Sequence, residues 1–415
     1  MLSRPIRGLK TFGNLFPRLK PWAIIGRHSV AELNQMQPKS FMLIAGEASG
    51  DLLAAELVSA LQAELPASTF FGAGGPRMAA AGVDLALDMT QHAVVGLTDV
   101  LKNYFKFKRL FEQLLALAIE RQPDAVIGVD FGGFNLRFGA AVKSWVRKNP
   151  EAGWNPKIIQ YISPQVWASR PGRAKKLEAD YDLLLSIFPF EKVWYSQRAP
   201  KLHVEFVGHP MLDRTSPKPV TKPAASGPLV LLLPGSRKSE LQRHLPVMFS
   251  AWERIQTAIP DSRALMVLPN EPLVELARSL GIPATVKIQT GKLPAALTAA
   301  TVAIASTGTV TMECAFYGVP TVTLYKTSWL TYEIARRIVT VKSLTMPNLL
   351  AGEEVMPEFI QHDAIGYNIA HATVKLLQSE PRRVKIKKRL TQIVSTLGKP
   401  GASRRAAAAI LELFA

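Results

Sequence analysis

Two loops in the second half of the sequence combine glycine with side chains that bind phosphate. The first, PGSR, places Gly235, Ser236 and Arg237 after a run of leucines. An arginine guanidinium makes paired hydrogen bonds to a phosphate, and a glycine lets the backbone approach it. On its own, this motif would more simply be an ordinary turn with a solvated arginine.

The second loop, ASTGTVTME, follows another apolar run and contains Thr307, Gly308 and Thr309. Backbone and hydroxyl donors at the start of a helix suit a diphosphate. Glu313, about one turn later, is placed to accept from ribose hydroxyls. The alternative is that the hydroxyls only cap the helix. Because two such loops occur in one half of the chain, a nucleotide diphosphate site is favoured.

The first half of the chain offers a carboxylate instead. In GVDFGGFN, Asp130 ends an apolar run, and Asn135 belongs to the helix expected after it. An acid at the end of a strand acts as a general base when its surroundings bring its pKa near the working pH. The same spacing also fits a turn-forming or helix-capping aspartate, and both interpretations stay open at this point.

A further small-residue loop, GEASGD, follows the apolar run 41–45. Its two acids, Glu47 and Asp51, make it a poor phosphate cradle, although backbone N–H groups before a helix usually suit an anion. We expect Glu47 to orient a sugar hydroxyl or to brace the loop. We expect Asp51 to favour the N-terminus of the helix that follows it.

One more segment, YISPQVWASRPGR, combines aromatic residues with bases that include Arg170. It either lines a cleft for a sugar and a phosphate or forms a surface loop. Metal chemistry finds little support in the sequence, since the histidines are scattered and neither an HExxH motif nor an Asp-x-Asp pair occurs. We therefore expect no metal site and no cofactor.

Alternating strands and helices must position these loops. From residue 40 onward, short apolar runs alternate with segments of helical period, which is typical of an α/β fold with parallel sheets. A proline-rich stretch, SPKPVTKPAASGP, interrupts the pattern before it restarts. We predict two doubly wound, Rossmann-like domains whose ligands bind beyond the carboxyl ends of the strands, in a cleft between the domains.

The predicted organisation has five parts. They are a basic, disordered extension over 1–39, an N-terminal domain over 40–213, a linker over 214–228, a C-terminal domain over 229–378 and a basic helical segment over 379–415. A helix over 93–120 interleaves phenylalanines with bases. We expect this helix to turn its apolar side chains toward the core, and the alternative is an interfacial helix that touches anionic lipid.

Composition limits the class of partner. The 415 residues carry a formal net charge of +18, which favours an anionic partner. The single cysteine, Cys314, excludes a disulfide within the chain and a cysteine-rich zinc site. No apolar run approaches the roughly 18 to 20 residues that cross a bilayer, so we expect any membrane contact to be peripheral.

In their order along the chain, these and other motifs resemble those of the lipid-A-disaccharide synthase family. The resemblance runs from Phe41 to about Leu377 and rests on AGEASGD, VGLTDVL, GVDFGGFN, YISPQVWASRPGR, FPFE, FVGHP, LLPGSRKSEL, ASTGTVTME, MPNLLAG and PEFIQ. It implies a GT-B glycosyltransferase that performs an inverting, metal-independent transfer. The donor would be UDP-2,3-diacylglucosamine, the acceptor 2,3-diacylglucosamine 1-phosphate, and the products UDP and the lipid A disaccharide 1-phosphate of lipopolysaccharide synthesis.

The resemblance also implies a place in the cell and roles for residues. The chain would act at the cytoplasmic surface of the inner membrane of a Gram-negative bacterium, without nucleic acid, and a homodimer is left open. Asp130 would deprotonate the acceptor 6-hydroxyl, and Arg237 would bind the diphosphate. The UDP-sugar site would also include Ser49, Gly50, Gly235, Ser236, Thr307, Gly308, Thr309, Glu313 and Asn348. Supporting residues would be Glu47, Asn135 and Arg170.

The sequence departs from the family pattern at a few positions. Gly132 and Gly133 replace a proline and an aspartate, which predicts a more flexible loop around Asp130, and Ser169 replaces a tryptophan. Two alternatives to the transferase remain. One is an enzyme of the same architecture that resembles UDP-sugar 2-epimerases, and the other is a UDP-sugar or lipid-binding protein without catalysis.

Overall fold

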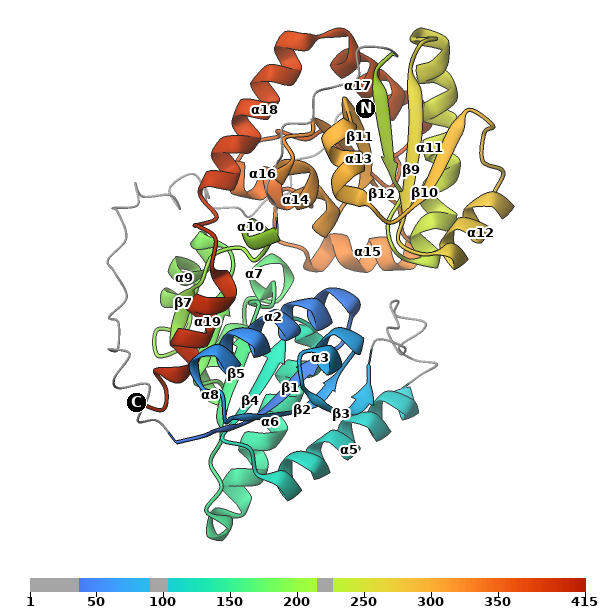
Figure 1. Cartoon of the computed structure of the whole chain (residues 1–415). Helices are drawn as coiled ribbons and strands as arrows, with labels where there is room; N and C mark the ends of the chain where they lie inside the picture. The colour runs from blue at the N-terminus through green and yellow to red at the C-terminus, as the bar shows by residue number, and fades with distance from the viewer. Residues whose placement is uncertain (1–36, 90–103, 215–226) are drawn as a thin grey trace. The chain divides into compact units, whose positions relative to one another are not determined.

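The computed structural model describes residues 37–89, 104–214 and 227–415 (Figure 1). Residues 1–36 of the predicted N-terminal extension and residues 215–226 of the predicted linker lie outside these residues. The chain divides into two compact units. Unit 1 contains the chain up to Val166, Pro171–Pro210 and Lys399–Ala415, and unit 2 contains Trp167–Arg170 and Met211–Gly398.

The described part of unit 1 is built on a seven-stranded parallel sheet with the order β3-β2-β1-β4-β5-β6-β7. The strands are β1 (Ser40–Ala45), β2 (Thr69–Gly74), β3 (Asp84–Asp88), β4 (Ala125–Val129), β5 (Lys157–Tyr161), β6 (Leu183–Ser186) and β7 (Val204–Phe206). The chain moves outward from β1 to one edge and then from β4 to the other. The order therefore reverses between β1 and β4, where ligands bind in doubly wound sheets.

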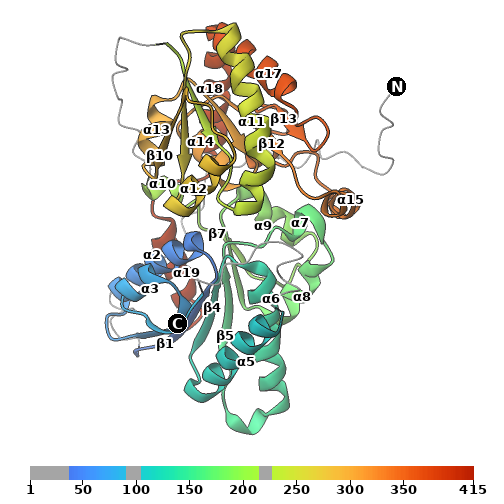
Figure 2. The same cartoon turned by 90° about the vertical axis from the view of Figure 1, so that its right-hand side faces the viewer.

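Helices cover both faces of this sheet (Figure 2). They are α2 (Ala48–Glu64), α3 (Pro76–Ala80), α5 (Tyr104–Arg121), α6 (Gly132–Lys148), the 3-10 turn η3 (Pro150–Ala152), α8 (Arg173–Asp180), α9 (Pro189–Ser196) and α19 (Ala402–Leu411). The short helix α7 (Val166–Ser169) belongs to unit 2 from Trp167 onward. The apolar strand FMLIA is buried throughout. Helix α5 is the described part of the helix predicted over 93–120. It buries Leu110, Leu114 and Ala118 but exposes Phe105.

The described part of unit 2 contains a six-stranded parallel sheet with the order β10-β9-β8-β11-β12-β13. The strands are β8 (Leu229–Leu233), β9 (Arg263–Leu268), β10 (Val286–Thr290), β11 (Val302–Ser306), β12 (Thr321–Tyr325) and β13 (Glu358–Ile360). The helices are α10 (Met211–Arg214), α11 (Lys238–Ala258), α12 (Glu271–Ser279), α13 (Leu293–Ala299), α14 (Thr309–Phe316), α15 (Trp329–Ile338), α16 (Met346–Ala351), α17 (Gly366–Gln378) and α18 (Glu380–Ser395). Here the strand order reverses between β8 and β11.

Alternate residues of β8 enter two separate cores, because successive side chains of a strand point to opposite faces. Val230 and Leu232 pack with α11, α12 and α17 on one face of the sheet. Leu231 and Leu233 pack with α13, α14 and α18 on the other. The prediction of two doubly wound α/β domains is confirmed.

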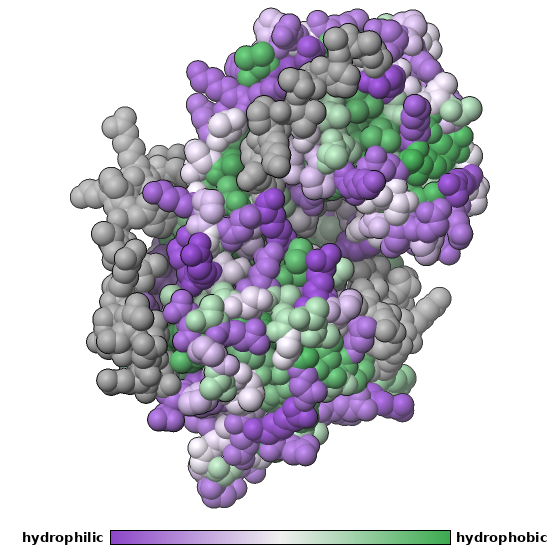
Figure 3. All heavy atoms as spheres, in the orientation of Figure 1, coloured by the Kyte–Doolittle hydropathy of each residue, from purple (hydrophilic) through white to green (hydrophobic). Residues whose placement is uncertain are grey.

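The segment 379–415, which we predicted as one basic helical part, contains two helices that belong to different units. Helix α18 packs on unit 2 through Leu390 and Ile393. Helix α19 returns to unit 1 and packs against α2. The face of α18 seen in Figure 3 is mostly hydrophilic, which fits a solvated basic helix.

Candidate active site

The first group of predicted site residues lies where the strand order of unit 1 reverses. Strands β1 and β4 are neighbours, and Ala45 at the end of β1 pairs with Val129 at the end of β4. Gly46 and Glu47 follow β1, and Asp130 follows β4. The structure therefore brings Glu47 and Asp130, which are far apart in the sequence, to the edge of the sheet where doubly wound domains bind ligands.

Asp130 occupies an unusual backbone conformation. Its φ is 52°, and that of Phe131 is 44°, so two consecutive residues other than glycine are left-handed. Such positions are strained and persist only where the surrounding structure determines them. Two side-chain amides do so here, since Gln160 Nε2 and Asn135 Nδ2 both donate to the carbonyl oxygen of Asp130 at 2.9 Å.

Gln160 also fixes the end of the neighbouring strand. Its Nε2 donates to the carbonyls of Tyr161 and Ile162, each at 3.2 Å, and Ile162 has a φ of 68°. One buried amide thus holds two adjacent strand ends. Gly128 leaves the room for it, because a Cβ there would lie 2.7 Å from Gln160 Oε1. Gln160 was not among the predicted site residues, although a glutamine inside the apolar strand KIIQY was a usable signal.

Asn135, predicted as a supporting residue, is part of the same arrangement. Besides the Asp130 carbonyl, its Nδ2 donates to the carbonyl of Ile44 in β1 at 3.3 Å. The backbone carbonyl oxygen of Asn135 accepts a hydrogen bond from the Tyr181 hydroxyl at 2.6 Å. Gly132 and Gly133 form the first turn of α6, and the expectation of a more flexible loop around Asp130 stays a prediction.

The surroundings of Asp130 alter its acidity. The side chain keeps accessible surface, but enclosing protein atoms weaken its solvation, and this raises the pKa of the carboxyl above its ordinary value. The negative charge of Glu47 raises the pKa further, while a hydrogen bond from the Phe131 N–H lowers it. A carboxylate with a raised pKa is a better proton acceptor than an ordinary aspartate.

Glu47→Gln is expected to move the acid limb of the pH profile of kcat/KM to lower pH. Removing the neighbouring charge lowers the pKa of Asp130, so the ionised base persists at lower pH. The measurement is kcat/KM against pH for both proteins. Glu64→Gln, at an exposed position of α2, is the control for charge loss, and an acid limb that moves equally in both variants, or in neither, would contradict the coupling of Glu47 to Asp130.

The later residues of GEASGD, from Ala48 onward, belong to helix α2. Ser49 is exposed in the first turn of α2. Gly50 is buried beside β4, and a Cβ there would be in ordinary contact with the Val129 carbonyl oxygen at 3.4 Å. The carboxylate of Asp51 accepts hydrogen bonds from the N–H groups of Gly75, Arg77 and Met78 at 2.9–3.0 Å. It therefore caps α3, whereas we had expected it to act on its own helix.

The second group of predicted residues lies where the strand order of unit 2 reverses. Leu233 of β8 pairs with Ala305 of β11. The PGSR loop follows β8, and the loop with Thr307 and Gly308 follows β11. Both nucleotide motifs inferred from the sequence are therefore adjacent, and each leads into a helix, α11 or α14. Helix N-termini at such a reversal suit a diphosphate.

The PGSR loop already holds an anionic group of the protein. Gly235 has a φ of 120°, and the carboxylate of Glu240 lies against it. One Glu240 oxygen accepts from the Ser236 N–H at 3.1 Å, and the other is 3.1 Å from Arg237 Nη1. Glu240 therefore already engages the donors that the diphosphate assignment needs, and binding of a diphosphate to this loop stays a prediction.

His244 connects the PGSR loop to the segment after β12. Its Nδ1 is 2.7 Å from the carbonyl oxygen of Pro234, and its Nε2 accepts from the Lys326 N–H at 3.0 Å. These partners require the neutral tautomer with the proton on Nδ1. Burial lowers the pKa of His244, which favours the same neutral form. His244 thereby fixes the ends of β8 and β12 to each other.

The loop after β11 turns sharply into α14. Gly308 has a φ of 133° and Thr309 begins the helix, with both residues exposed. The hydroxyl of Thr311 donates to the Gly308 carbonyl at 2.7 Å, so that hydroxyl is already engaged in the turn. Burial raises the pKa of Glu313, and the charge of Arg214 partly opposes this.

Asn348 has structural partners throughout. Its Nδ2 donates to the carbonyl of Met356 and to Glu358 Oε1, and its Oδ1 accepts from the N–H groups of Val355 and Met356, all at 2.7–2.8 Å. Four hydrogen bonds exhaust the two donors and two lone pairs of an amide. A direct contact of Asn348 with the sugar nucleotide stays a prediction that would require some of these bonds to break. Arg170 is exposed at the end of α7.

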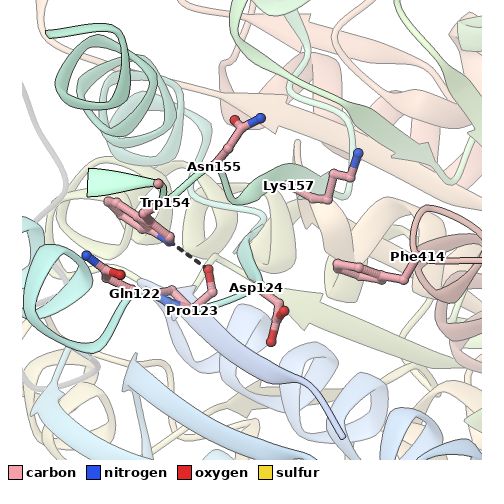
Figure 4. Close-up of a pocket in the computed structure, with 8 residues that line it drawn as sticks. Gln122, Pro123, Asp124, Trp154, Asn155, Lys157 and Phe414 are labelled. Atoms are coloured by element: carbon pink, nitrogen blue, oxygen red, sulfur yellow. Dashed lines mark hydrogen bonds between the residues drawn. The ribbon is translucent and has the colours of Figure 1, made fainter. Parts of the chain in front are cut away.

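Other features of the described residues offer no alternative centre. Within 37–89, 104–214 and 227–415, no group of three or more His, Cys, Asp or Glu side chains could hold a metal ion. Trp154, Pro123 and Phe414 line a pocket in unit 1 (Figure 4). Trp154 Nε1 donates a hydrogen bond to the Pro123 carbonyl oxygen at 2.9 Å. The pocket lies at the amino ends of β4 and β5, opposite the edge that carries Asp130.

Comparison with known sequences decides the family. The family model described as Lipid-A-disaccharide synthetase matches residues 41–413. The chain belongs to the lipid-A-disaccharide synthase family. It is 38% identical to the lipid-A-disaccharide synthase of Trichlorobacter lovleyi, over 91% of this chain and 98% of that protein. Its identity to the enzyme of Myxococcus xanthus is 34%, with the same coverage.

Solved structures share the fold at much lower identity. The calicheamicin glycosyltransferase CalG4 aligns with a TM-score of 0.57 at 15% identity, over 91% of this chain and 98% of that one. UDP-GlcNAc 2-epimerase from Neisseria meningitidis aligns with a TM-score of 0.59 at 11% identity, over 90% and 100%. This lipid-A-disaccharide synthase family member is thus a glycosyltransferase with the predicted GT-B fold. Among its described residues, no helix is both long and apolar enough to cross a membrane.

Proposed function

We propose that this member of the lipid-A-disaccharide synthase family transfers 2,3-diacylglucosamine from UDP to the 6-hydroxyl of 2,3-diacylglucosamine 1-phosphate. The products are the β-1,6-linked disaccharide 1-phosphate and UDP. The observation that carries the proposal is the position of Asp130. It lies at the strand-order reversal of unit 1, in a chain of this family, and the enclosing protein atoms and the charge of Glu47 raise its pKa.

In the proposed reaction Asp130 is the general base. It takes the proton of the acceptor 6-hydroxyl as that oxygen attacks the anomeric carbon of the donor. The bond from the anomeric carbon to the diphosphate oxygen breaks, and UDP leaves with the electron pair. Gln160 and Asn135 hold the backbone of Asp130, so the carboxylate requires little reorganisation to reach its working position.

We propose that unit 2 binds the departing UDP. Arg237 and the N–H groups of the PGSR loop and of the loop at Thr307–Thr309 face the negative charge that develops on the diphosphate. Glu313 accepts from the ribose hydroxyls. Because an arginine and two helix N-termini supply positive charge, we propose that the transfer needs no metal ion and no other cofactor.

The remaining assignments concern the sugar and the membrane. We propose that Ser49 and Gly50 approach the donor sugar, that Asn348 acts by holding its segment, and that Arg170 contacts a phosphate. The acceptor is a phosphorylated lipid, and the +18 charge of the chain suits an anionic surface. We therefore propose peripheral association with the cytoplasmic face of the inner membrane.

Acceptor-dependent release of UDP tests the proposal. UDP-2,3-diacylglucosamine is incubated with the protein, with and without 2,3-diacylglucosamine 1-phosphate in detergent, and UDP and disaccharide are quantified. We expect equal amounts of both products and none without acceptor. An acceptor that lacks the 6-hydroxyl is the matched control and should yield no UDP. Release of UDP without acceptor, a change of sugar configuration, or tight binding without turnover would each contradict transfer.

A further inference from the structure

Helix α15 exposes its apolar side chains instead of burying them. None of its ten residues is buried. Leu330, Ile334 and Ile338 are 63%, 40% and 38% exposed, and Trp329 is 67% exposed. A surface helix normally turns its apolar stripe toward the core. Here the opposite arrangement leaves several large apolar side chains in contact with water, which indicates an interaction surface.

The exposed side chains form one continuous stripe. Leu330, Ile334 and Ile338 are spaced by four residues and therefore lie above one another on one side of the helix. The other side is attached to unit 2, where the Tyr332 ring packs edge-on against His362 at 5.9 Å. Ser328 caps the helix by accepting from the Thr331 N–H. The orientation of the stripe is thus set by contacts on the opposite side of α15.

The charges beside the stripe are positive. Arg336 and Arg337 are exposed on α15, and Lys342 is exposed shortly after it. The acid of the helix, Glu333, forms an ion pair with Arg336 at 3.2 Å and is only 21% exposed. Aliphatic side chains, an exposed tryptophan and arginines on one short helix match the interfacial region of an anionic bilayer.

We propose that α15 is a membrane-contacting element of this protein, with Leu330, Ile334 and Ile338 inserted among anionic phospholipids and Trp329 at the headgroup level. Charge distinguishes this occupant from others. A second copy docked on α15 through the same face would bring Arg336, Arg337 and Lys342 close to the same three bases, and nucleic acid would not require the aliphatic stripe. The inference deepens the proposed peripheral association by naming the element responsible.

The position of α15 adds a functional reason. The segment before it is bound to the nucleotide loops, because the Lys326 N–H donates to His244, which contacts the PGSR loop. Gln361 Oε1 accepts from the Thr327 N–H at 3.1 Å and holds the next residue. A bilayer contact at α15 would therefore keep the loops assigned to UDP close to the surface from which a lipid-linked donor arrives.

Vesicle binding by the full chain tests this inference. Flotation is measured with vesicles of phosphatidylcholine, with and without phosphatidylglycerol, for the wild type and for L330S/I334S/I338S. We expect the wild type to bind only the anionic vesicles and the triple variant to bind them at least about tenfold more weakly. Brominated lipid should quench tryptophan fluorescence in the wild type, and Trp329→Phe should remove most of that quenching.

The controls separate α15 from general charge and from misfolding. Lys385→Gln/Lys388→Gln removes two charges from exposed positions of α18 and should bind vesicles like the wild type, whereas Arg336→Gln/Arg337→Gln should bind weakly. Unchanged thermal melting and UDP affinity establish that the variants fold. Unaltered vesicle binding by the triple variant, or loss of binding only in the α18 variant, would overturn the proposal. A wild type that is dimeric by gel filtration and a triple variant that is monomeric would also overturn it, because the stripe would then be a contact between two copies. Because vesicle binding needs no turnover, failure of the proposed reaction would be seen separately in the detergent assay.

Discussion

Asp130→Asn is expected to lower kcat by about 10²–10⁴-fold while leaving the Kd of UDP largely unchanged. The amide cannot accept the proton of the acceptor hydroxyl, so the transition state loses its general base. Asparagine is the appropriate replacement because residue 130 has a φ of 52°, and asparagine tolerates left-handed backbone better than alanine does. The measurements are single-turnover disaccharide formation and calorimetric titration with UDP.

Glu64→Gln is the matched control for Asp130→Asn. Glu64 is an exposed acid at the last position of α2 in the same unit, and its replacement changes the net charge equally. It should retain wild-type turnover. If Asp130→Asn also turns over at the wild-type rate, another group removes the acceptor proton. If it melts like the wild type but fails to bind UDP, Asp130 acts in donor binding, which contradicts the expected effect on turnover alone.

The fold was predictable because the signal that determines it is local. Apolar runs such as FMLIA and LVLLL alternate with helical segments, and glycine-containing loops follow the strands. Once the strands are parallel and in the observed order, the loops after β1 and β4, and those after β8 and β11, must be adjacent. This explains why four motifs chosen from their residue types form two groups in the structure.

The contacts that sequence analysis missed involve residues far apart in the chain. Asp51 caps the helix that begins 25 residues later at Pro76, and Gln160 holds the carbonyl of Asp130 from the neighbouring strand. Neither partner is set by residue spacing, since each depends on which strands become neighbours. The exposure of α15 is similar. Its periodicity predicts an apolar stripe, but only the packing of Tyr332 shows that the stripe faces outward.

The role of Asn348 illustrates a different limit. A family motif identifies a residue that matters, but it does not distinguish a ligand contact from a structural one. Here the amide closes the segment from Val355 to Glu358, and Glu358 in turn accepts from the N–H groups of Leu344 and Thr345. A position can therefore match a functional motif because it shapes the site.

Arg237→Ala is expected to weaken UDP binding by about 10- to 100-fold, since a charge-assisted hydrogen bond contributes about 1.5–3 kcal/mol. The loss has two parts. The guanidinium no longer attracts the diphosphate, and Glu240, which lies 3.1 Å from Arg237 Nη1, keeps its negative charge beside the PGSR loop. Calorimetric titration with UDP gives the Kd. Arg254→Ala, an exposed arginine of the same helix α11, should bind UDP like the wild type.

The double variant Arg237→Ala/Glu240→Ala separates these two parts. Removing Glu240 as well relieves the repulsion, so the double variant should bind UDP more tightly than Arg237→Ala alone, though still more weakly than the wild type. Glu240→Ala by itself should retain UDP binding and melt at a slightly lower temperature, because it removes an acid from the first turn of α11. Equal affinity in the two arginine variants would show that Glu240 does not oppose the diphosphate. Wild-type affinity in Arg237→Ala would remove the arginine from the nucleotide site, because no other change in that variant compensates for a lost cation.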